Sequence, residues 1–353
     1  MRISITFGGA RNSDWDGATD FVVEAERLGV HDVWSAEAWG YDAVTPLAYL
    51  AAKTSTIRLG TGIMQAGTRT PALVAMTAMS LASLSNNRFV LGFGTSGPQV
   101  IEGWHGIPFD RPVTRMRELI EIVRIATKGE RLSYQGKVYT LPLPGGEGKP
   151  LRSGSPAVPD IPVYLATLSP RSLALTGELA DGWLGTSFMP DHAGVFFDHI
   201  ASGATKAGRS LADLDLQAGG VVAFGDDAES LTPRRKPGLA FTLGAMGSRE
   251  HNFYNAAFQR AGYEDVAQEA QRLWLDGKRD EAAELVPDEL VLKTNLLGTD
   301  AMVKDRIRVY RDAGVTTLRV DPEGRTPTER LDTLARAIDL VKAVDAEPAR
   351  VAR

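Results

Sequence analysis

Short runs of β-type residues alternate with longer segments of helical period along most of this chain, at a spacing of roughly 30 residues. A strand that returns to a parallel neighbour needs a crossover of this length, so the alternation predicts right-handed βαβ units and a parallel sheet. A closed eight-stranded α/β barrel fits the number of runs better than the alternative, an open doubly wound sheet. The runs expected as strands are 3–7, 32–35, 57–63, 88–93, 161–166, 182–185, 216–224 and 317–320.

The segments between these runs carry apolar residues at helical spacing. Gly8 and Gly9 end the first strand, Gly29 follows the first helix, and Pro71 suits the first position of the third. The expected helices are 14–28, 41–54, 71–84, 112–127, one that begins at 170, 191–207, 301–313 and 328–344.

Two segments interrupt the alternation of strands and helices but do not look like domain boundaries. Residues 1–353 are therefore expected to form a single barrel domain. Residues 129–160 combine a hairpin at 131–141 with a stretch rich in Gly and Pro at 142–148. Residues 225–297, helical over about 239–275, enter between the seventh and eighth strands and must emerge at one end of the barrel. They are expected to form a substrate wall through Phe253 and Tyr254, with a hinge at 244–249; a helical pair outside the barrel or at a dimer contact is the alternative.

Composition and missing motifs exclude several kinds of chemistry. The chain has no cysteine, which excludes disulfides, thiolate metal sites and a cysteine nucleophile. A net charge of -5 gives no electrostatic case for binding nucleic acid or an anionic membrane. No transmembrane stretch or secretory leader is evident, so a cytoplasmic protein is expected. The five histidines (His31, His105, His192, His199, His251) show no zinc-binding spacing, so no metal is expected, and no Rossmann, P-loop or nucleophile-elbow motif occurs in a suitable context.

The active site of such a barrel lies at the carboxyl ends of its strands. The loops that follow these ends combine a few polar groups with aromatic residues and glycines, a mixture that suits a flat aromatic cofactor. Glu37 is a candidate acid or cofactor hydrogen-bond partner, and an N-cap or salt-bridge role is the alternative. Trp39 and Tyr41 are wall candidates or ordinary packing residues. The segment 167–171 leads into a helix N-terminus, which is a natural site for a phosphate.

At these loops the chain resembles the luciferase-like flavin and deazaflavin oxidoreductases, most closely the coenzyme F420-dependent branch that includes methylene-tetrahydromethanopterin reductases. The resemblance runs over nearly the whole chain. The stretches that carry it are VWSAEAWGYD (33–42), RLGTGI (58–63), SNNRFVLGFGTSGPQVIEGW (85–104), IPVYLA (161–166) and ADGW (180–183).

The resemblance implies a barrel with the cofactor ring at the carboxyl ends of the strands, and commonly a homodimer. It also implies a cis peptide bond at Gly62–Ile63 and a phosphate held after the fifth strand. The cofactor-binding residues it implies are Glu37, Gly62, Ile63, Gln65, Gly94, Thr95, Thr167, Leu168 and Arg171. The expected substrate wall comprises Trp39, Tyr41, Trp104, Phe253 and Tyr254.

The chain departs from the F420-dependent sugar-phosphate dehydrogenases at one position. Where those enzymes have an Asp-His pair whose His acts as a base, this chain has Glu37-Ala38, which favours a reductase or another acid–base group, with Glu37 as the catalytic candidate. The predicted function is therefore hydride transfer between the C5 carbon of F420 and a small organic substrate. The alternatives are an FMN-dependent monooxygenase with a separate reductase, and a non-catalytic flavin-binding or ligand-binding barrel.

Overall fold

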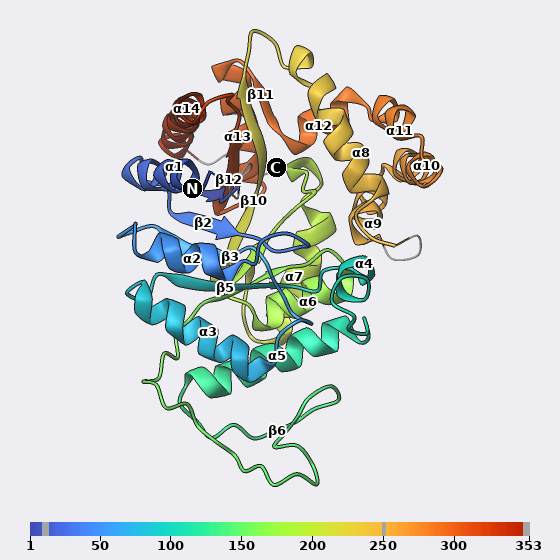
Figure 1. Cartoon of the computed structure of the whole chain (residues 1–353). Helices are drawn as coiled ribbons and strands as arrows, with labels where there is room; N and C mark the ends of the chain where they lie inside the picture. The colour runs from blue at the N-terminus through green and yellow to red at the C-terminus, as the bar shows by residue number, and fades with distance from the viewer. Residues whose placement is uncertain (9–13, 249–251, 349–353) are drawn as a thin grey trace.

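The computed structural model describes residues 1–8, 14–248 and 252–348, and its core is a closed barrel of parallel strands surrounded by helices (Figure 1). Hydrogen bonds connect the strands in the order β1, β2, β3, β5, β8, β9, β10 and β12, and β12 pairs with β1 to close the ring. The barrel strands are β1 (Arg2–Thr6), β2 (Asp32–Ser35), β3 (Arg58–Thr61), β5 (Phe89–Gly94), β8 (Val163–Ala166), β9 (Gly182–Leu184), β10 (Asp215–Phe224) and β12 (Thr317–Pro322). The predicted barrel is confirmed, and each strand overlaps its expected range.

Two short strands were not predicted. β4 (Met64–Gln65) continues the line of β3 and pairs with the end of β5. β11 (Leu296–Gly298) lies inside the 225–297 insertion and pairs in parallel with the far end of β10, where Val222 is opposite Leu296. Gly9, expected to help end the first strand, lies outside the described residues.

The longer helices that follow the strands cover the outside of the barrel. They are α1 (Trp15–Arg27), α2 (Val44–Ala51), α3 (Pro71–Leu84), α5 (Pro112–Thr127), α6 (Pro170–Leu179), α7 (Gly194–Lys206), α13 (Asp300–Asp312) and α14 (Pro327–Asp345). The short helix α4 (Pro98–Ile101) lies at the carboxyl ends of the strands instead, where its Gln99 and Val100 line a cavity. The bounds of α3 and α5 are as predicted. Helix α2 is shorter than expected because the Asp42 carboxylate accepts from the N–H groups of Val44 and Thr45 at 2.8 Å each, so residues 41–43 remain outside the helix. No helix in the described part of the chain is long and apolar enough to cross a bilayer.

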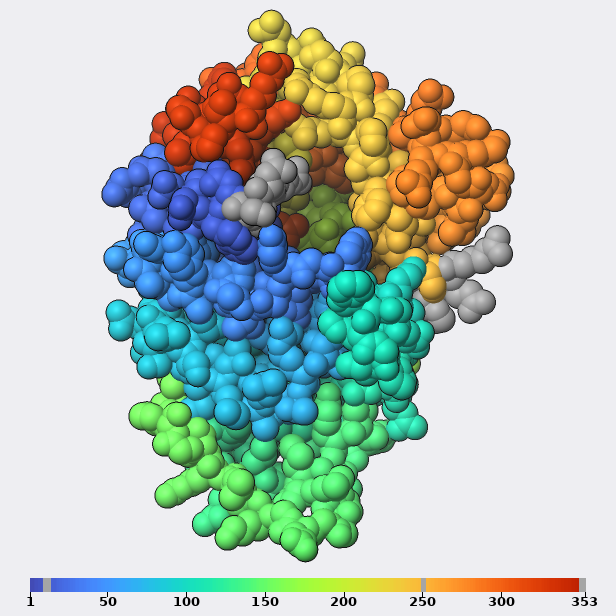
Figure 2. All heavy atoms as spheres, in the orientation of Figure 1, coloured from blue at the N-terminus to red at the C-terminus, as the bar shows by residue number. Residues whose placement is uncertain are grey.

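Residues 129–160 form a projection beside α5 at the lower end of the molecule (Figures 1 and 2). The hairpin expected at 131–141 is present as β6 (Tyr134–Gln135) paired antiparallel with β7 (Thr140–Leu141). The buried carboxylate of Glu118, on α5, accepts from the N–H groups of 137–139 at 2.7–2.9 Å and fixes the hairpin to the barrel.

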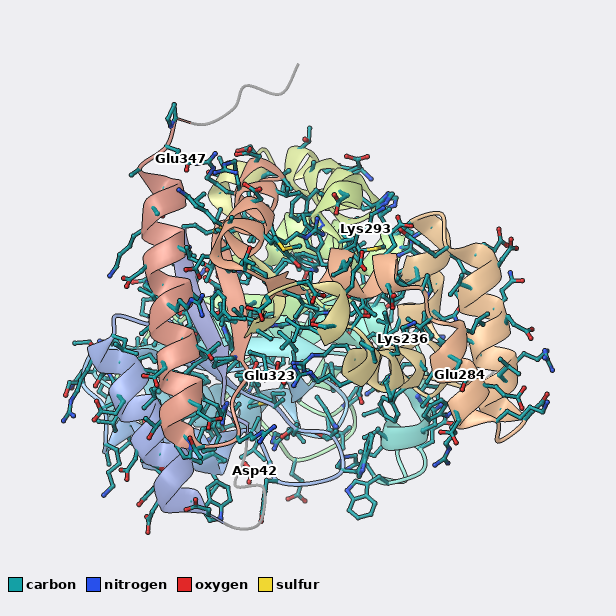
Figure 3. All side chains as sticks on the ribbon, turned by 90° about the horizontal axis from the view of Figure 1, so that it is seen from above. Asp42, Lys236, Glu284, Lys293, Glu323 and Glu347 are labelled. Carbon is teal, nitrogen blue, oxygen red and sulfur yellow. The ribbon has the colours of Figure 1, made fainter. Side chains whose placement is uncertain are left out.

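In its described residues, 225–248 and 252–297, the insertion contains five α-helices with an apolar core of their own. They are α8 (Lys236–Gly244), α9 (Phe253–Arg260), α10 (Glu264–Leu275), α11 (Arg279–Leu285) and α12 (Asp288–Thr294), so the helical part extends further in both directions than predicted. Leu243, Phe258 and Leu290 are completely buried in this core. Glu323, labelled in Figure 3, follows β12 and forms an ion pair of 2.7 Å with Arg234, which ties the start of the insertion to the barrel rim.

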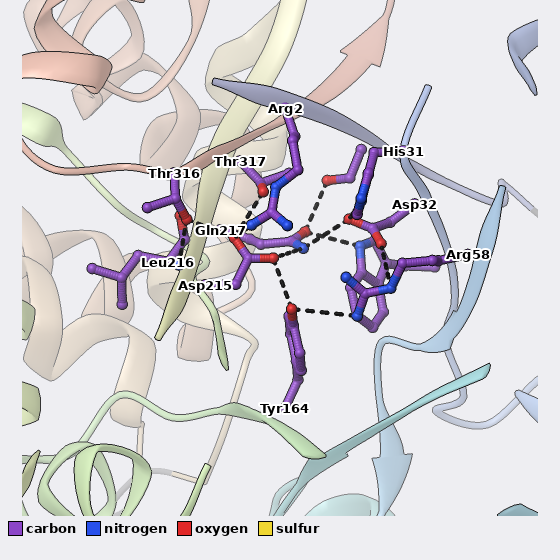
Figure 4. Close-up of polar contacts among 12 residues, drawn as sticks. Arg2, His31, Asp32, Arg58, Tyr164, Asp215, Leu216, Gln217, Thr316 and Thr317 are labelled. Carbon is purple, nitrogen blue, oxygen red and sulfur yellow. Dashed lines mark hydrogen bonds and ion pairs between the residues drawn. The ribbon is translucent and has the colours of Figure 1, made fainter. Parts of the chain in front are cut away.

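The half of the barrel lumen at the amino-terminal ends of the strands is filled by a network of polar side chains centred on Gln217 (Figure 4). Its side-chain oxygen accepts from Ser4 Oγ and Trp34 Nε1, both at 3.0 Å. Its side-chain nitrogen donates to Asp32 at 3.0 Å and to Asp215 at 2.9 Å. The amide thereby uses all four of its hydrogen-bonding positions and connects three strands.

Asp215 is the most heavily bonded carboxylate of this network. It accepts from Thr316, Thr317 and Tyr164 at 2.6–2.8 Å and pairs with Arg2 at 2.7 Å. Burial alone would raise the pKa of Asp215, but the hydrogen bonds and the charge of Arg2 together lower it. Because the folded pKa lies below the unfolded one, the ionised group stabilises the fold at neutral pH.

We therefore expect Asp215→Asn to lower the free energy of unfolding by about 3 kcal/mol at neutral pH, because the hydroxyls of Thr316, Thr317 and Tyr164 lose the ionised acceptor that they share. The difference from wild type should be constant above about pH 5 and should shrink as the pH falls below about 4, towards the folded pKa. Chemical denaturation at several pH values measures it, with Asp339→Asn as the control, since the Asp339 side chain is 77% exposed. A difference that grew with acidification would contradict the role assigned to Asp215.

Candidate active site

A cavity of about 610 Å³ lies at the carboxyl ends of the barrel strands, between the barrel rim and the helical insertion. Figure 2 shows this face hollowed between the blue N-terminal third and the yellow segment that leads into α8. Most of the residues expected at the site line this cavity. They are Glu37, Trp39, Ile63, Gly94, Thr95, Trp104, Thr167, Leu168, Phe253 and Tyr254.

Gly62 and Gln65, both expected to contact the cofactor, lie behind the cavity wall instead. A Cβ atom at Gly62 would be 2.9 Å from Cβ of Trp34, so this glycine makes room for the indole. Gln65 is buried, and its side-chain nitrogen donates to the carbonyl of Ala38 at 3.0 Å. Neither residue lines the cavity directly; both shape the loops that bear the lining residues.

Tyr41 and Arg171 also lie off the cavity. The Tyr41 ring packs edge-on against Trp15, with 4.9 Å between the ring centroids, and is 54% exposed. Tyr41 thus packs at the α1 rim, as the alternative prediction had it, and does not line the cavity. Arg171 is exposed on the first turn of α6. Its neighbours Ser169 and Ser172 line the cavity, but Arg171 itself does not.

The floor of the cavity is built around Ile63. The Gly62–Ile63 peptide bond is cis, as expected from the resemblance. A Cβ atom at Gly94 would be 3.0 Å from Cγ1 of Ile63, so the isoleucine packs directly on the backbone of β5. The result is an apolar floor bordered by backbone, which suits the face of a flat ring.

Glu37 lies at one edge of the cavity with both carboxylate oxygens occupied. Arg69 binds it through two nitrogens, at 2.5 and 2.9 Å. The N–H groups of Gln65 and Ala43 donate to it at 2.9 and 3.1 Å. A proton on either oxygen would have to displace one of these donors, so the geometry favours a role in which Glu37 holds the loops after β2 and β3 together.

The opposite edge of the cavity is the loop that enters α6. Thr167, Leu168, Ser169 and Ser172 line it. Ser169 caps the helix, and its Oγ accepts from the N–H of Ser172 at 3.3 Å. The first turn of α6 thus presents its positive end to the cavity, where an anion would be stabilised.

Three residues that sequence reasoning missed complete the site. Arg69 follows the third strand, and Arg260 on α9 donates to the carbonyl of Leu168 at 2.6 Å. Met246, between α8 and α9, lines the cavity. An arginine four residues after the candidate Gln65 was a visible signal for Arg69. Arg260 lies in an insertion whose position the sequence pattern does not reveal. Arg249 of the expected hinge and His251 lie outside the described residues.

Comparison with known proteins agrees with this geometry. Residues 3–317 match the model of a family described as luciferase-like monooxygenases. This chain belongs to that family. A Mycobacterium tuberculosis protein, whose name describes a coenzyme F420-dependent oxidoreductase, is 40% identical over 309 residues, 85% of this chain and 89% of its own.

Two further relatives are reductases. The 5,10-methylenetetrahydromethanopterin reductase of Methanolobus tindarius is 30% identical over 298 residues, 83% of this chain and 86% of its own. The solved coenzyme F420-dependent tetrahydromethanopterin reductase of Methanopyrus kandleri superposes with a TM-score of 0.77 and 23% identity, over 95% of this chain and 96% of its own. The resemblance to this luciferase-like family is confirmed, and so is its barrel fold. Among the described residues, no group of three or more His, Asp or Glu side chains is placed to hold a metal ion.

The pairing of Glu37 with Arg69 makes a testable prediction. We expect Glu37→Gln to lower the free energy of unfolding by about 2 kcal/mol, because a charged, partly buried network loses its centre. Arg69→Met should cost a similar amount, and the double variant no more than either alone, as measured by chemical denaturation. Glu269→Gln, which breaks the exposed pair with Arg272, is the control and should change stability little. Unchanged stability in Glu37→Gln, together with lost turnover, would instead show a chemical role for Glu37.

Proposed function

We propose that this protein is a coenzyme F420-dependent oxidoreductase that transfers a hydride between the deazaflavin C5 and a small organic substrate. The observation that carries the proposal is one cavity with an apolar floor at Ile63 and an anion-binding helix end at α6, the two parts that a flat, phosphate-bearing cofactor requires. The names of the relatives support F420 as that cofactor.

The residues present fit such a group. Ile63 and the backbone at Gly94 and Thr95 would support the ring, since any side chain at Gly94 would press on Ile63. Thr167, Leu168 and Ser169 would hold the phosphate at the start of α6. When bound, F420 supplies a carbon that gives or takes a hydride, so the protein needs no nucleophile of its own.

The chain's own contribution is to orient the substrate and exclude water. The insertion lines one side of the cavity with four apolar or aromatic side chains. They are Phe241 on α8, Met246 after it, and Phe253 and Tyr254 on α9. Trp104, which is 65% exposed, lines the side of α4. Once cofactor and substrate fill the cavity, its mainly apolar lining would strengthen the few polar contacts inside and shield a reactive hydride from water.

An FMN-dependent monooxygenase is the second candidate, because the family model carries the monooxygenase description. It would need oxygen and a separate reductase. The affinity for the two cofactors separates the candidates: we expect the purified protein to bind F420 more tightly than FMN, as measured by fluorescence titration. FMN binding at least about tenfold tighter than F420, a difference of about 1.4 kcal/mol, would favour the monooxygenase.

The phosphate position can be tested by charge reversal. Arg171→Glu puts a negative side chain on the first turn of α6, so we expect it to weaken F420 binding about three- to tenfold through repulsion of the phosphate. Arg152→Glu, an equal change at an exposed arginine of the 129–160 projection, is the control and should leave the affinity unchanged. Equal affinities of the two variants would place the phosphate elsewhere.

The wall formed by the insertion predicts a separate result. Replacing Phe253 and Tyr254 by alanine should lower the turnover of a reducible substrate about tenfold or more, because the substrate loses its orientation. The affinity for F420, measured on the same double variant, should change much less. Unchanged turnover would reject the wall, and weakened F420 binding alone would place these side chains over the cofactor.

Assembly and location are part of the same proposal. The exposed side chains of Tyr49 on α2 and of Leu73, Met76 and Leu84 on α3 form an apolar surface on one side of the barrel, which supports a homodimer. A cytoplasmic location remains a prediction from the sequence.

A further inference from the structure

Two tryptophans line the active-site cavity with most of their surface exposed. Trp39, in the loop between β2 and α2, is 57% exposed, and Trp104, which follows α4, is 65% exposed. Among residues 1–8, 14–248 and 252–348, neither indole nitrogen has a hydrogen-bond partner and neither indole packs against another aromatic ring. Because tryptophan carries a large apolar surface, two such side chains exposed at one cavity indicate a surface that a ligand covers.

The exposure of these rings does not come from loosely held loops. The carbonyl of Ala38, next to Trp39, accepts from the side-chain nitrogen of Gln65 at 3.0 Å. The N–H of Trp104 donates to the carbonyl of Val100 at 3.0 Å, which continues the helical turn of α4. Since the backbone beside both rings is already held in place, a ligand that covers them would have little protein to order.

The charges of the cavity argue against an ionised substrate. Glu37 is the one charged side chain among the described lining residues, and its two carboxylate oxygens bind Arg69. No lysine, arginine or histidine of the described part of the chain lines the cavity. A cofactor phosphate at the start of α6 would add negative charge to the same cavity. An anionic substrate would therefore be repelled, and it would lose its hydration without gaining a counter-ion.

The polar groups that remain in the lining are uncharged, and most of them are already bonded within the protein. The Thr167 hydroxyl pairs with that of Thr176 at 2.7 Å, and the hydroxyls of Ser169 and Ser172 pair with each other at 2.8 Å. The side-chain amide of Gln99, exposed on α4, has no hydrogen-bond partner among the described residues. One free amide can donate to a carbonyl oxygen, but it cannot replace the hydration of a full charge.

We propose that the substrate is an uncharged, largely apolar molecule with a ring system, whose apolar body lies on Trp39 and Trp104 while its reacting group lies over the cofactor ring. The inference rests on the proposed function, since it names the substrate class of the same site. The two tryptophans are thereby specificity-determining residues. The free amide of Gln99 supplies a polar contact to a neutral oxygen of the substrate.

The test uses three probes that share a naphthalene ring and differ in charge. They are 2-acetylnaphthalene, which is neutral, 2-naphthoate, an anion, and 2-naphthylmethylammonium, a cation. Each is titrated into the F420-loaded protein and into the protein without cofactor, and binding is followed by ligand-observed NMR. We expect the neutral probe to bind at least about tenfold more tightly than either ion. Its preference over the anion should be larger with F420 bound, because of the cofactor phosphate.

Variants of the exposed side chains locate the apolar surface. Trp39→Ala and Trp104→Ala should each weaken binding of the neutral probe about three- to tenfold, and the corresponding phenylalanine variants should keep part of the affinity. Gln99→Leu should weaken it about threefold. Since both tryptophans are more than half exposed, their replacement should leave the midpoint of chemical denaturation unchanged.

Leu151→Ala is the matched control, because Leu151 is as exposed as Trp104 but lies on the 129–160 projection. This variant should bind all three probes as wild type does. The affinity of each tryptophan variant for F420 should stay within about twofold of wild type, since the surface is for the substrate.

An ion that binds the wild type as tightly as the neutral probe would overturn the substrate class. Wild-type affinity for the neutral probe in both alanine variants would overturn the role of the tryptophans. Loss of F420 binding in those variants would overturn it too, because the rings would then belong to the cofactor. A wild-type protein that binds the neutral probe through these tryptophans but does not bind F420 would refute the proposed function and leave the apolar subsite standing.

Discussion

The hydrogen bonds of the Gln217 amide determine which end of the barrel lumen is filled and which is left for a ligand. This one side chain bonds to Ser4, Trp34, Asp32 and Asp215, so the amino-terminal end of the lumen is occupied by side chains that satisfy one another's hydrogen bonds. Breaking any of these hydrogen bonds would leave a buried polar group without a partner, so the network resists rearrangement. The space for a ligand is therefore at the other end, where the strands finish and the loops begin.

The same network sets the floor of the site. Trp34 is held by its bond to Gln217, and glycines at the facing strand positions accommodate its ring: a Cβ atom at Gly60 would be 2.2 Å from the indole. Ile63 lies above this tryptophan and packs against it in a small apolar cluster. Contacts thus connect the polar network at Gln217, through Trp34, to the apolar surface at Ile63 that a ring can contact.

Much of the fold could be predicted from the sequence because a parallel barrel repeats one local pattern. The helix at Pro112–Thr127 has the predicted boundaries, since a proline opens it and Gly129 follows its end. β4 and β11 span only two and three residues, too few for any periodicity to appear. The extent of the helical insertion depends on its own core around Leu243 and Phe258, whose contacts are tertiary.

The site could be predicted to the level of loops, because a barrel brings all its strand ends together. Which loop residues face the cavity depends on pairings between distant segments. Glu37 is bound by an arginine 32 positions away. The sequence pattern does not contain this pairing, which changes the role that a glutamate after a strand would suggest by itself.

The proposed cofactor site is one cavity that holds the ring at Ile63 and the phosphate at the start of α6. A crystal structure of the protein with F420 would show both positions at once. We expect the deazaflavin ring against Ile63 and Gly94, with the phosphate within hydrogen-bonding distance of Thr167, Leu168 or Ser169. An ordered F420 whose phosphate lies away from α6, or whose ring does not touch Ile63, would contradict it.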